Sequence, residues 1–406
     1  MDKKVVENKI RRSVKQVHDR NQKRLDKKTT SFISLRIQYN LSIRNQKTNE
    51  EFQISDIEDY MDESPVALIG GPGAGKSTLL LKMAVQLSEK NLDNYAAMIP
   101  IYVQCGLLSS YDRLEDEIHL SGYSEEEKKY LWENGKLCLL FDGINEAVNV
   151  EMGKLLRDVV NLSEEYPECR YVINCRAIEF PIWASSYFEP YSILPVKDEQ
   201  IRTQFCKEFG DVTGEKYYTE LINSSHNYLF ELCKNPLLLS LVIRIISQSM
   251  DSIDEFSFSQ IKGKGDIYRE FCRSLIQHEL KKIKRERESY FEIIRDRLFT
   301  TLAYYMQANN KVYISREEME VVIRNMPYGK GRETDYIKFI SSSSSGEKSL
   351  WYREIAEDVI KSSFFNLHLL ETKESVYISF IHQSFQEFYA GKYMAGNNTV
   401  HDKKYV

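Results

Sequence analysis

Glycine, lysine and hydroxyl side chains are concentrated in residues 70–78, which read GGPGAGKST. Glycine has no Cβ, so backbone N–H groups in such a stretch can curl around the oxygens of an anion. In the pattern Gly70-x4-Gly75-Lys76-Ser77, the Lys76 ammonium suits the outer phosphates of a nucleotide and the Ser77 hydroxyl suits Mg²⁺. The residues predicted to bind the nucleotide here are Gly70, Gly71, Pro72, Gly73, Ala74, Gly75, Lys76, Ser77 and Thr78.

Two acids follow an apolar run later in the chain, in KLCLLFDGINEA (136–147). Asp142 comes directly after the run and is predicted to join Ser77 in holding Mg²⁺. Glu146 lies four residues further on and is the candidate to orient or deprotonate an attacking water. The alternative is an ordinary surface turn that carries two carboxylates.

An arginine follows another apolar run, in RYVINCRAIEF (170–180). Arg176 is predicted to reach the γ-phosphate, because a guanidinium offers several donors to phosphate oxygens. The alternative is that Arg176 is an ordinary solvated arginine. This alternative is stronger for Arg176 than the surface-turn alternative is for Asp142 and Glu146. The pattern N-K-x-D, which would indicate guanine, does not occur, so adenine is the expected base.

Short apolar segments separated by helical stretches position these residues between 65 and 195. Their nearly continuous apolar character predicts a parallel sheet that is covered on both faces. The expected strands are PVALI (65–69), MIPIYV (98–103), KLCLLF (136–141), RYVINC (170–175) and YSIL (191–194). In the preceding connector, SFISLRIQY (31–39) either adds a strand or packs over the nucleotide.

Helices dominate after Pro195. They are expected at 198–209, 215–224, 227–249 and within 260–308, and another begins at Ser315. Within KNPLLLSL, Asn235 suits an N-cap and Pro236 the first helical position. Near the end, FFNLHLLE, TKES and VYISFIH predict strand, turn and strand, followed by the helix QSFQEFYAGKYM. This order favours a winged-helix unit.

The chain has 406 residues, of which 42% are hydrophobic and 28% charged, and its net charge is −5. That composition indicates a globular protein and argues against a general binder of polyanions. Residues 1–28 are the exception, with eleven Lys and Arg against four Asp and Glu. The seven cysteines are scattered and predict reduced thiols. Neither a signal peptide nor an apolar run long enough to span a membrane is recognisable, so a cytoplasmic location is expected.

An apolar stripe is predicted on a helix in residues 1–25, formed by Val6, Ile10, Val14 and Val17. Such a stripe needs a covering surface. The candidates are the chain's own nucleotide-binding domain, an effector protein or a neighbouring subunit, with membrane or nucleic acid as weaker alternatives.

Five motifs in this order resemble the NACHT family of STAND nucleotide triphosphatases, which includes bacterial defence proteins. They are GGPGAGKSTLL, LLFDGINE, VINCR, CKNPLLLSL and FIHQSFQEFYAGKYM, spread over about residues 65–395. The resemblance implies an α/β phosphate-loop NTPase with a five-stranded parallel sheet, followed by an all-helical domain and a winged-helix domain. The implied bounds are 1–64 for the helix and connector, 65–195 for the nucleotide-binding domain, 196–258 for the helical domain, 259–395 for the winged-helix region and 396–406 for a tail.

The resemblance also implies ATP and ADP as ligands with Mg²⁺. It places Pro236 near the adenine, and His382 on the β-phosphate in a closed, ADP-bound form. The expected function is a signalling switch in bacterial antiviral defence that oligomerises on activation. Asn145 departs from the family pattern, which has an acid there, so Glu146 acts alone and slow ATP hydrolysis is expected. The short flanks predict either an excised core or separate effector and sensor modules, although Met1 suits a native start.

Two other functions fit part of the sequence. A motor or loader of the AAA+ type also has a phosphate loop, but it would turn over ATP quickly. A nucleic-acid-binding regulator would use the winged helix and the basic stretches, such as KKIKRER (281–287). A small-molecule kinase would leave half of the chain unexplained.

Overall fold

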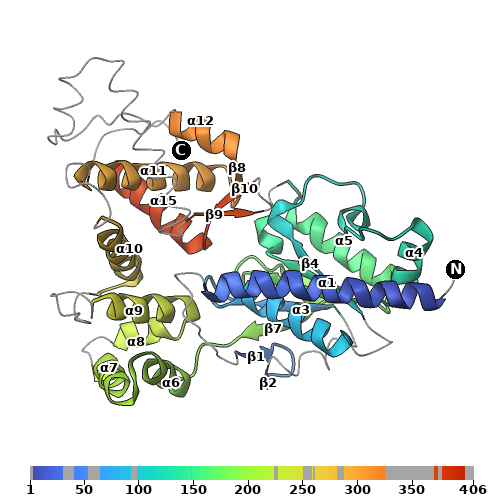
Figure 1. Ribbon diagram of the computed structural model, residues 1–406, viewed down its shortest axis with the longest axis horizontal. Helices are drawn as coiled ribbons and strands as arrows, with labels where there is room; N and C mark the ends of the chain where they lie inside the picture. Colours follow the sequence, from blue (N-terminus) through green and yellow to red (C-terminus); the bar gives the residue numbers. More distant parts are fainter. Residues whose placement is uncertain are drawn as a thin grey trace. The chain divides into compact units, whose positions relative to one another are not determined.

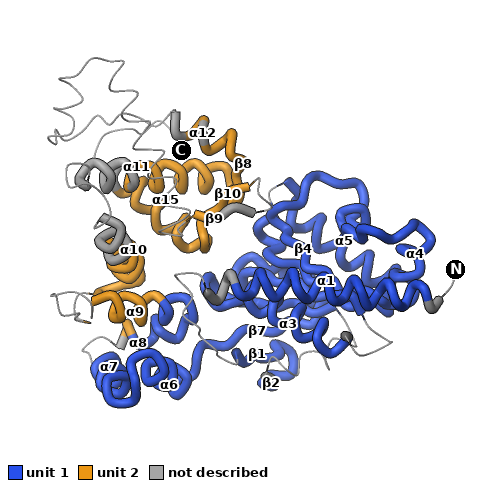
Figure 2. The backbone as a smooth tube through the Cα atoms, viewed as in Figure 1, with its two compact units in different colours: residues 1–223, 230–240 blue, residues 224–229, 241–406 orange. Residues whose placement is uncertain are grey.

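The structure is a computed structural model, and its chain divides into two compact units (Figure 2). Unit 1 comprises residues 1–223 and 230–240, and unit 2 comprises residues 224–229 and 241–406. The structure describes residues 3–30, 41–53, 65–92, 98–147, 149–223, 227–249, 258, 261–280, 288–324, 370–373 and 377–397. The segment SFISLRIQY, the basic stretch 281–287 and residues 398–406 of the predicted tail lie outside the described residues.

A seven-stranded sheet forms the centre of unit 1, with the order β2-β1-β7-β3-β6-β5-β4. The five strands from β3 to β7 are parallel and correspond to the five predicted segments. Their bounds are β3 Val66–Ile69, β4 Ile99–Gln104, β5 Leu137–Asp142, β6 Arg170–Cys175 and β7 Glu189–Ile193. The predicted count of five strands is too low. The short antiparallel strands β1 (Ser42–Asn45) and β2 (Glu51–Gln53) extend the sheet beyond β7.

Helices cover both faces of this sheet. Helix α3 (Lys76–Leu92) buries Leu80 and Met83 against Leu68 and other side chains of one face. Helix α5 (Met152–Glu165) belongs to a second core cluster that includes Ala67 on the opposite face. Neighbouring residues of β3 therefore enter different cores, as the two-residue period of a strand requires. Helix α4 (Glu125–Glu133) starts with the capping box that Ser124 and Glu127 form.

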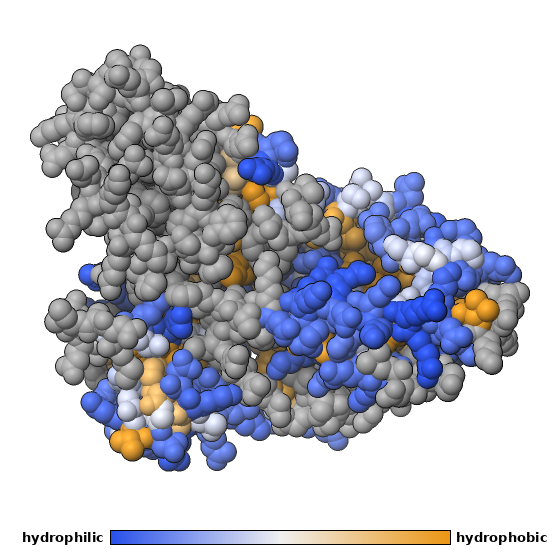
Figure 3. Space-filling view, in the orientation of Figure 1, coloured by the Kyte–Doolittle hydropathy of each residue, from blue (hydrophilic) through white to orange (hydrophobic). Residues whose placement is uncertain are grey.

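The predicted N-terminal helix is α1 (Lys3–Thr30), which packs against α3 and β4. Its apolar stripe is covered by unit 1 itself: Val6, Ile10 and Val14 are buried, and Val17 packs against the same cluster. Polar contacts reinforce the packing, since the Lys9 ammonium lies 2.6 Å from a carboxylate oxygen of Glu127. The outward face of α1 is largely hydrophilic (Figure 3).

Four helices follow the sheet in sequence, as predicted in outline. They are α6 (Asp198–Phe209), α7 (Asp211–Asn223), α8 (Asn227–Cys233) and α9 (Pro236–Ser249). The single helix expected over 227–249 is interrupted before Pro236, which has no N–H to continue a helix. All seven cysteines are free thiols, and all but Cys206 are buried.

Unit 2 contains a three-stranded antiparallel sheet with the order β8-β10-β9. The strands are β8 (Ile314–Ser315), β9 (Leu370–Lys373) and β10 (Tyr377–Phe380). The helices are α10 (Lys264–Leu280), α11 (Glu288–Ala308), α12 (Arg316–Arg324) and α15 (Gln383–Asn397). Strand β9 includes Thr372 and Lys373, which were expected in the turn. The winged-helix assignment and the domain bounds stay predictions.

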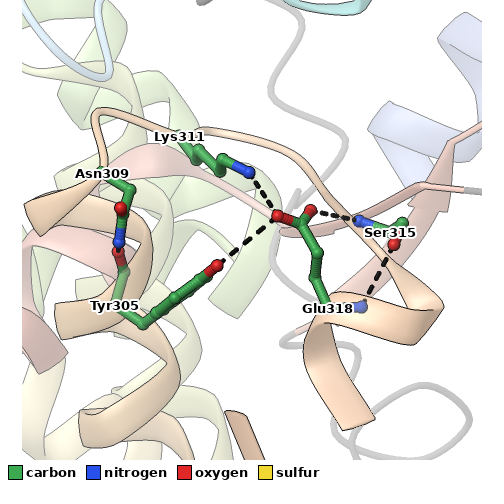
Figure 4. A network of polar contacts seen from close by, with 5 residues as sticks. All are labelled: Tyr305, Asn309, Lys311, Ser315 and Glu318. Atoms are coloured by element: carbon green, nitrogen blue, oxygen red, sulfur yellow. Dashed lines mark hydrogen bonds and ion pairs between the residues drawn. The ribbon is translucent and has the colours of Figure 1, made fainter. Parts of the chain in front are cut away.

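A polar network fixes the start of α12 in unit 2 (Figure 4). The Glu318 carboxylate accepts a hydrogen bond from the Ser315 N–H at 3.1 Å, while the Glu318 N–H donates to the Ser315 hydroxyl at 3.1 Å. The Lys311 ammonium pairs with the same carboxylate. The predicted helix start at Ser315 is therefore a reciprocal capping box, which satisfies two backbone donors.

Candidate nucleotide-binding site

The glycine-rich stretch 70–78, here called the phosphate loop, connects β3 to α3 in unit 1. Figure 1 labels helix α3. Gly73 and Gly75 have φ angles of 76° and 93°, which side-chain-bearing residues rarely adopt. Helix α3 begins at Lys76, and the first amides of a helix have no acceptor within it. The loop therefore leads into a helix N-terminus, which favours a bound anion.

The backbone of this loop is approached closely from two sides. A Cβ placed on Gly73 would lie 2.7 Å from the Asn235 side-chain oxygen and 2.9 Å from the Leu237 Cβ. A Cβ on Gly75 would lie 3.1 Å from a methyl group of Leu41. By contrast, a Cβ on Gly71 would meet no atom within 4 Å. Gly73 and Gly75 are thus required both by their backbone conformation and by the close packing around them.

The Lys76 side chain extends back along the phosphate loop. Its Nζ donates hydrogen bonds to the carbonyl oxygens of Gly70 and Gly71, at 2.8 Å and 3.0 Å. Burial lowers the pKa of the Lys76 ammonium, and the Arg176 guanidinium lowers it further. The carboxylates of Glu146 and Asp142 act in the opposite direction. The three other charged side chains singled out from the sequence thus lie close enough to act on Lys76, and two neighbouring cations favour an anionic ligand.

The strand order explains why these residues meet. Strand β6 lies between β3, which leads into the phosphate loop, and β5, which ends at Asp142. All three strands are parallel, so their carboxyl ends share one edge of the sheet. Arg176 directly follows β6 and is therefore held between the phosphate loop and the acids.

Asp142 is held by two side chains that the sequence analysis did not single out. One of its carboxylate oxygens accepts a hydrogen bond from Asn174 Nδ2 at 2.6 Å, and the other accepts one from the Tyr102 hydroxyl. Asn174 Oδ1 also accepts from the Gly143 N–H at 2.6 Å. Asn174 is 1% exposed. The sequence did offer one signal for Asn174: it is an amide within the apolar run RYVINC, and a buried polar group needs hydrogen-bond partners.

Glu146 belongs to a tight turn after β5. Gly143 has a φ of 71°, and a Cβ at this position would lie 2.8 Å from the Glu146 carboxyl carbon. The Glu146 N–H donates to the Gly143 carbonyl at 2.8 Å. Glycine at 143 thus lets the chain bring the second acid back toward the end of β5.

The start of α9 also contacts the phosphate loop. Asn235 is the predicted N-cap: its Oδ1 accepts from the N–H groups of Leu237 and Leu238 at 3.1 Å and 3.2 Å. Its Nδ2 donates to the Pro72 carbonyl at 2.9 Å. The Leu237 N–H also lies 3.3 Å from the Gly73 carbonyl. One side chain therefore caps a helix and binds the loop. Pro236 occupies the first helical position, as predicted.

His382 belongs to unit 2, where it precedes α15. Its Nδ1 lies 3.1 Å from the Ser384 N–H, which donates to it. The imidazole therefore helps to cap α15. Its expected contact with a β-phosphate stays a prediction.

A magnesium ion fits the residues at the edge of the sheet. Within the described part of the chain, no three His, Cys, Asp or Glu side chains form a group that would hold a metal by itself. Mg²⁺ usually takes one or two protein oxygens, with phosphate and water completing its shell. The Ser77 hydroxyl and the Asp142 carboxylate supply that kind of donor set.

No family model and no curated protein matches the chain. Among solved structures, Cdc6p from Pyrobaculum aerophilum is 12% identical, with a TM-score of 0.33 over 84% of this chain and 93% of that one. A Walker-type ATPase from Pyrococcus abyssi is 13% identical, with a TM-score of 0.33 over 85% and 97%. A STAND protein with a tetratricopeptide repeat sensor, from Pyrococcus horikoshii, is 14% identical, with a TM-score of 0.38.

The match to the STAND protein covers 83% of this chain but only 41% of that protein. At these scores the likenesses carry no argument about activity, and the site is assigned from its own residues. None of the described helices is long and apolar enough to cross a membrane.

Proposed function

We propose that unit 1 binds ATP and ADP with Mg²⁺ and hydrolyses ATP slowly. The observation that carries this proposal is the convergence of the phosphate loop, Asp142, Glu146 and Arg176 at one edge of a parallel sheet, with their charges acting on Lys76. Three sequence motifs that are far apart in the chain supply complementary parts of one reaction. An ordinary glycine turn would not require those partners.

Each residue has a distinct task in this proposal. The phosphate-loop amides and Lys76 bind the β- and γ-phosphates, and Ser77 and Asp142 hold Mg²⁺. When bound, Mg²⁺ neutralises charge on the phosphate oxygens. Glu146 orients the attacking water and accepts its proton, while Arg176 stabilises negative charge on the γ-phosphate.

Slow turnover follows from the residue next to Glu146. Asn145 can orient a water or a metal ligand, but its amide cannot act as a base. Glu146 is therefore the single acid of the turn that can accept a proton. Such an enzyme would keep ATP bound for long periods, as a timing switch requires.

The resemblance to NACHT proteins supports a switch rather than a motor. In this proposal ADP favours a closed form through Pro236 and His382, and ATP favours an open form that self-associates. A ligand can shift such an equilibrium only by binding one form better. The setting is bacterial antiviral defence in the cytoplasm, with effector and sensor modules as partners. An AAA+-type motor or loader is the competing function, and nucleic-acid binding is the other alternative.

Turnover measurements test the proposal and separate the two kinds of ATPase. We expect Mg²⁺-dependent hydrolysis well below about 1 s⁻¹, the lower end of common enzyme rates. Glu146→Gln should retain ATP binding and lose about 100-fold or more in rate, because general base catalysis contributes about that much. A variant as fast as the parent would show that Glu146 is not the water-activating acid. Fast turnover by the parent would favour the motor.

A further inference from the structure

The Asp142 carboxylate is held from both neighbouring strands. Strand β5 lies between β4 and β6, which contribute Tyr102 and Asn174 respectively. The Tyr102 hydroxyl donates to one carboxylate oxygen, and Asn174 Nδ2 donates to the other. A carboxyl group normally rotates freely about its terminal bond. Hydrogen bonds to both oxygens from opposite sides restrict that rotation to one orientation.

We propose that Tyr102 and Asn174 are positioning residues that orient Asp142 for Mg²⁺, and that helix α1 supports Tyr102 through Arg24. This inference rests on the proposed function, because it takes Asp142 to be a magnesium ligand. Neither residue was singled out in the sequence analysis, although Asn174 lies within the motif VINCR. The proposal makes the magnesium requirement, rather than nucleotide affinity alone, the property that these residues control.

The hydrogen-bond arrangement leaves Asp142 able to bind a metal. Each carboxylate oxygen has two lone pairs, so one accepted hydrogen bond leaves each oxygen with further capacity. Partners behind a metal ligand fix its geometry, and their loss typically lowers metal affinity about 10–100-fold. Tyr102 and Asn174 are hydrogen-bond partners of this kind for Asp142.

Asn174 connects the two acids of the site. Its Nδ2 faces the Asp142 carboxylate and its Oδ1 faces the Gly143 N–H. The opposite amide orientation would bring oxygen against oxygen and N–H against N–H, so the environment permits only one. Gly143 begins the turn that carries Glu146. One buried side chain therefore sets the position of both the metal ligand and the turn that presents the second acid.

Helix α1 reaches the same network. The Arg24 guanidinium carbon lies 5.6 Å from the centroid of the Tyr102 ring, within the range of a cation–π interaction. The helix is anchored to unit 1 by its buried apolar stripe, so Arg24 is presented by a fixed element. The N-terminal helix thus gains a role at the nucleotide site beyond covering the core.

The test uses Tyr102→Phe and Asn174→Ala in the full chain, with Tyr171→Phe as the matched control. Tyr171 is a buried tyrosine on β6 whose hydroxyl donates to the Leu162 carbonyl at 2.9 Å, away from Asp142. Tyr102→Phe and Tyr171→Phe therefore remove the same atom from different surroundings. Binding of a fluorescent ATP analogue is measured in EDTA and across a Mg²⁺ titration, together with the Mg²⁺ concentration for half-maximal hydrolysis.

We expect Tyr102→Phe and Asn174→Ala to raise the half-saturating Mg²⁺ concentration about 10-fold or more, while affinity in EDTA stays at the parental value. Tyr171→Phe should keep the parental magnesium requirement. Arg24→Gln should give a shift in the same direction of about two- to fivefold, the size expected for a cation–π contact that is partly accessible to solvent. Unequal effects of the two tyrosine variants would separate positioning from a general loss of stability.

A parental magnesium requirement in Tyr102→Phe would overturn the positioning role, even if Asn174→Ala fails to fold. An unchanged requirement in Arg24→Gln would remove α1 from the account. If the parent chain binds no nucleotide in either condition, the proposed function itself fails, and that result is distinguishable from the others.

Discussion

Gly73 shows how a single residue can be constrained from two directions. Its φ of 76° disfavours any side chain, and a Cβ there would crowd Asn235 and Leu237. We predict that Gly73→Ala lowers the free energy of unfolding by about 1–3 kcal/mol, the usual cost of such a backbone conformation. It should also weaken nucleotide binding, because the loop must move to relieve the contacts.

Gly71→Ala is the matched control for stability, since its added Cβ would meet nothing within 4 Å. Chemical denaturation of both variants measures the difference. Equal stability of the two variants would contradict the structure of the loop around Gly73.

Individual site residues were predictable where a motif fixed their spacing. Lys76 and Asp142 were found in this way, because each follows an apolar strand in a recognisable pattern. Tyr102 and Asn174 were missed. Tyr102 looks like an ordinary strand residue in sequence, and the amide of Asn174 indicates a buried polar group but not its partner. Only the pairing of β4, β5 and β6 shows that both face Asp142. Contacts between strands depend on sheet order, which local sequence does not determine.

Helix α1 shows, at the level of elements, that local sequence does not determine long-range contacts. Its apolar stripe was visible in the spacing of valine and isoleucine, but the surface that covers it was not. We predict that Ile10→Ala lowers the free energy of unfolding by about 2–5 kcal/mol, because Ile10 is 4% exposed and its loss leaves a cavity. Thermal and chemical denaturation measure the change.

Val5→Ala on the same helix is the control, because Val5 is 57% exposed. Its effect should stay within about 0.5 kcal/mol, as for other surface substitutions. A small effect of Ile10→Ala would mean that α1 does not pack on unit 1 in solution.

The strands differed in how readily they could be predicted. The five parallel strands are buried on both faces, so each appears as a nearly continuous apolar run. Strands β1 and β2 are short, and β2 begins with a glutamate at the edge of the sheet. The pairing of β1 with β7 is a long-range contact that local composition does not reveal, and the predicted strand count was therefore too low.

Switching between nucleotide states belongs to the whole molecule, and His382 is the residue through which it can be tested. If its imidazole donates to the β-phosphate of ADP, the hydrogen bond is charge-assisted and worth about 1.5–3 kcal/mol. We predict that His382→Ala lowers ADP affinity about 10-fold or more and ATP affinity much less. It should also favour self-association. Equilibrium titrations and light scattering measure both effects.

His119→Ala is the comparison variant, since His119 is an exposed histidine of unit 1. Both variants remove one imidazole, so a shared effect would be nonspecific. ADP affinity equal to the parent's in His382→Ala would leave that residue with its local role of capping α15, and the closed-form contact would be rejected.

The central claim is that the phosphate loop binds a nucleotide through Lys76, and calorimetric titration with ATP and ADP tests it most directly. The parent chain should bind both nucleotides in the presence of Mg²⁺. Lys76→Ala should retain a cooperative unfolding transition and lose binding of both, because it removes the partly buried cation at the N-terminus of α3. Undiminished affinity in the folded variant would contradict the assignment of the loop and, with it, the proposed ATPase site.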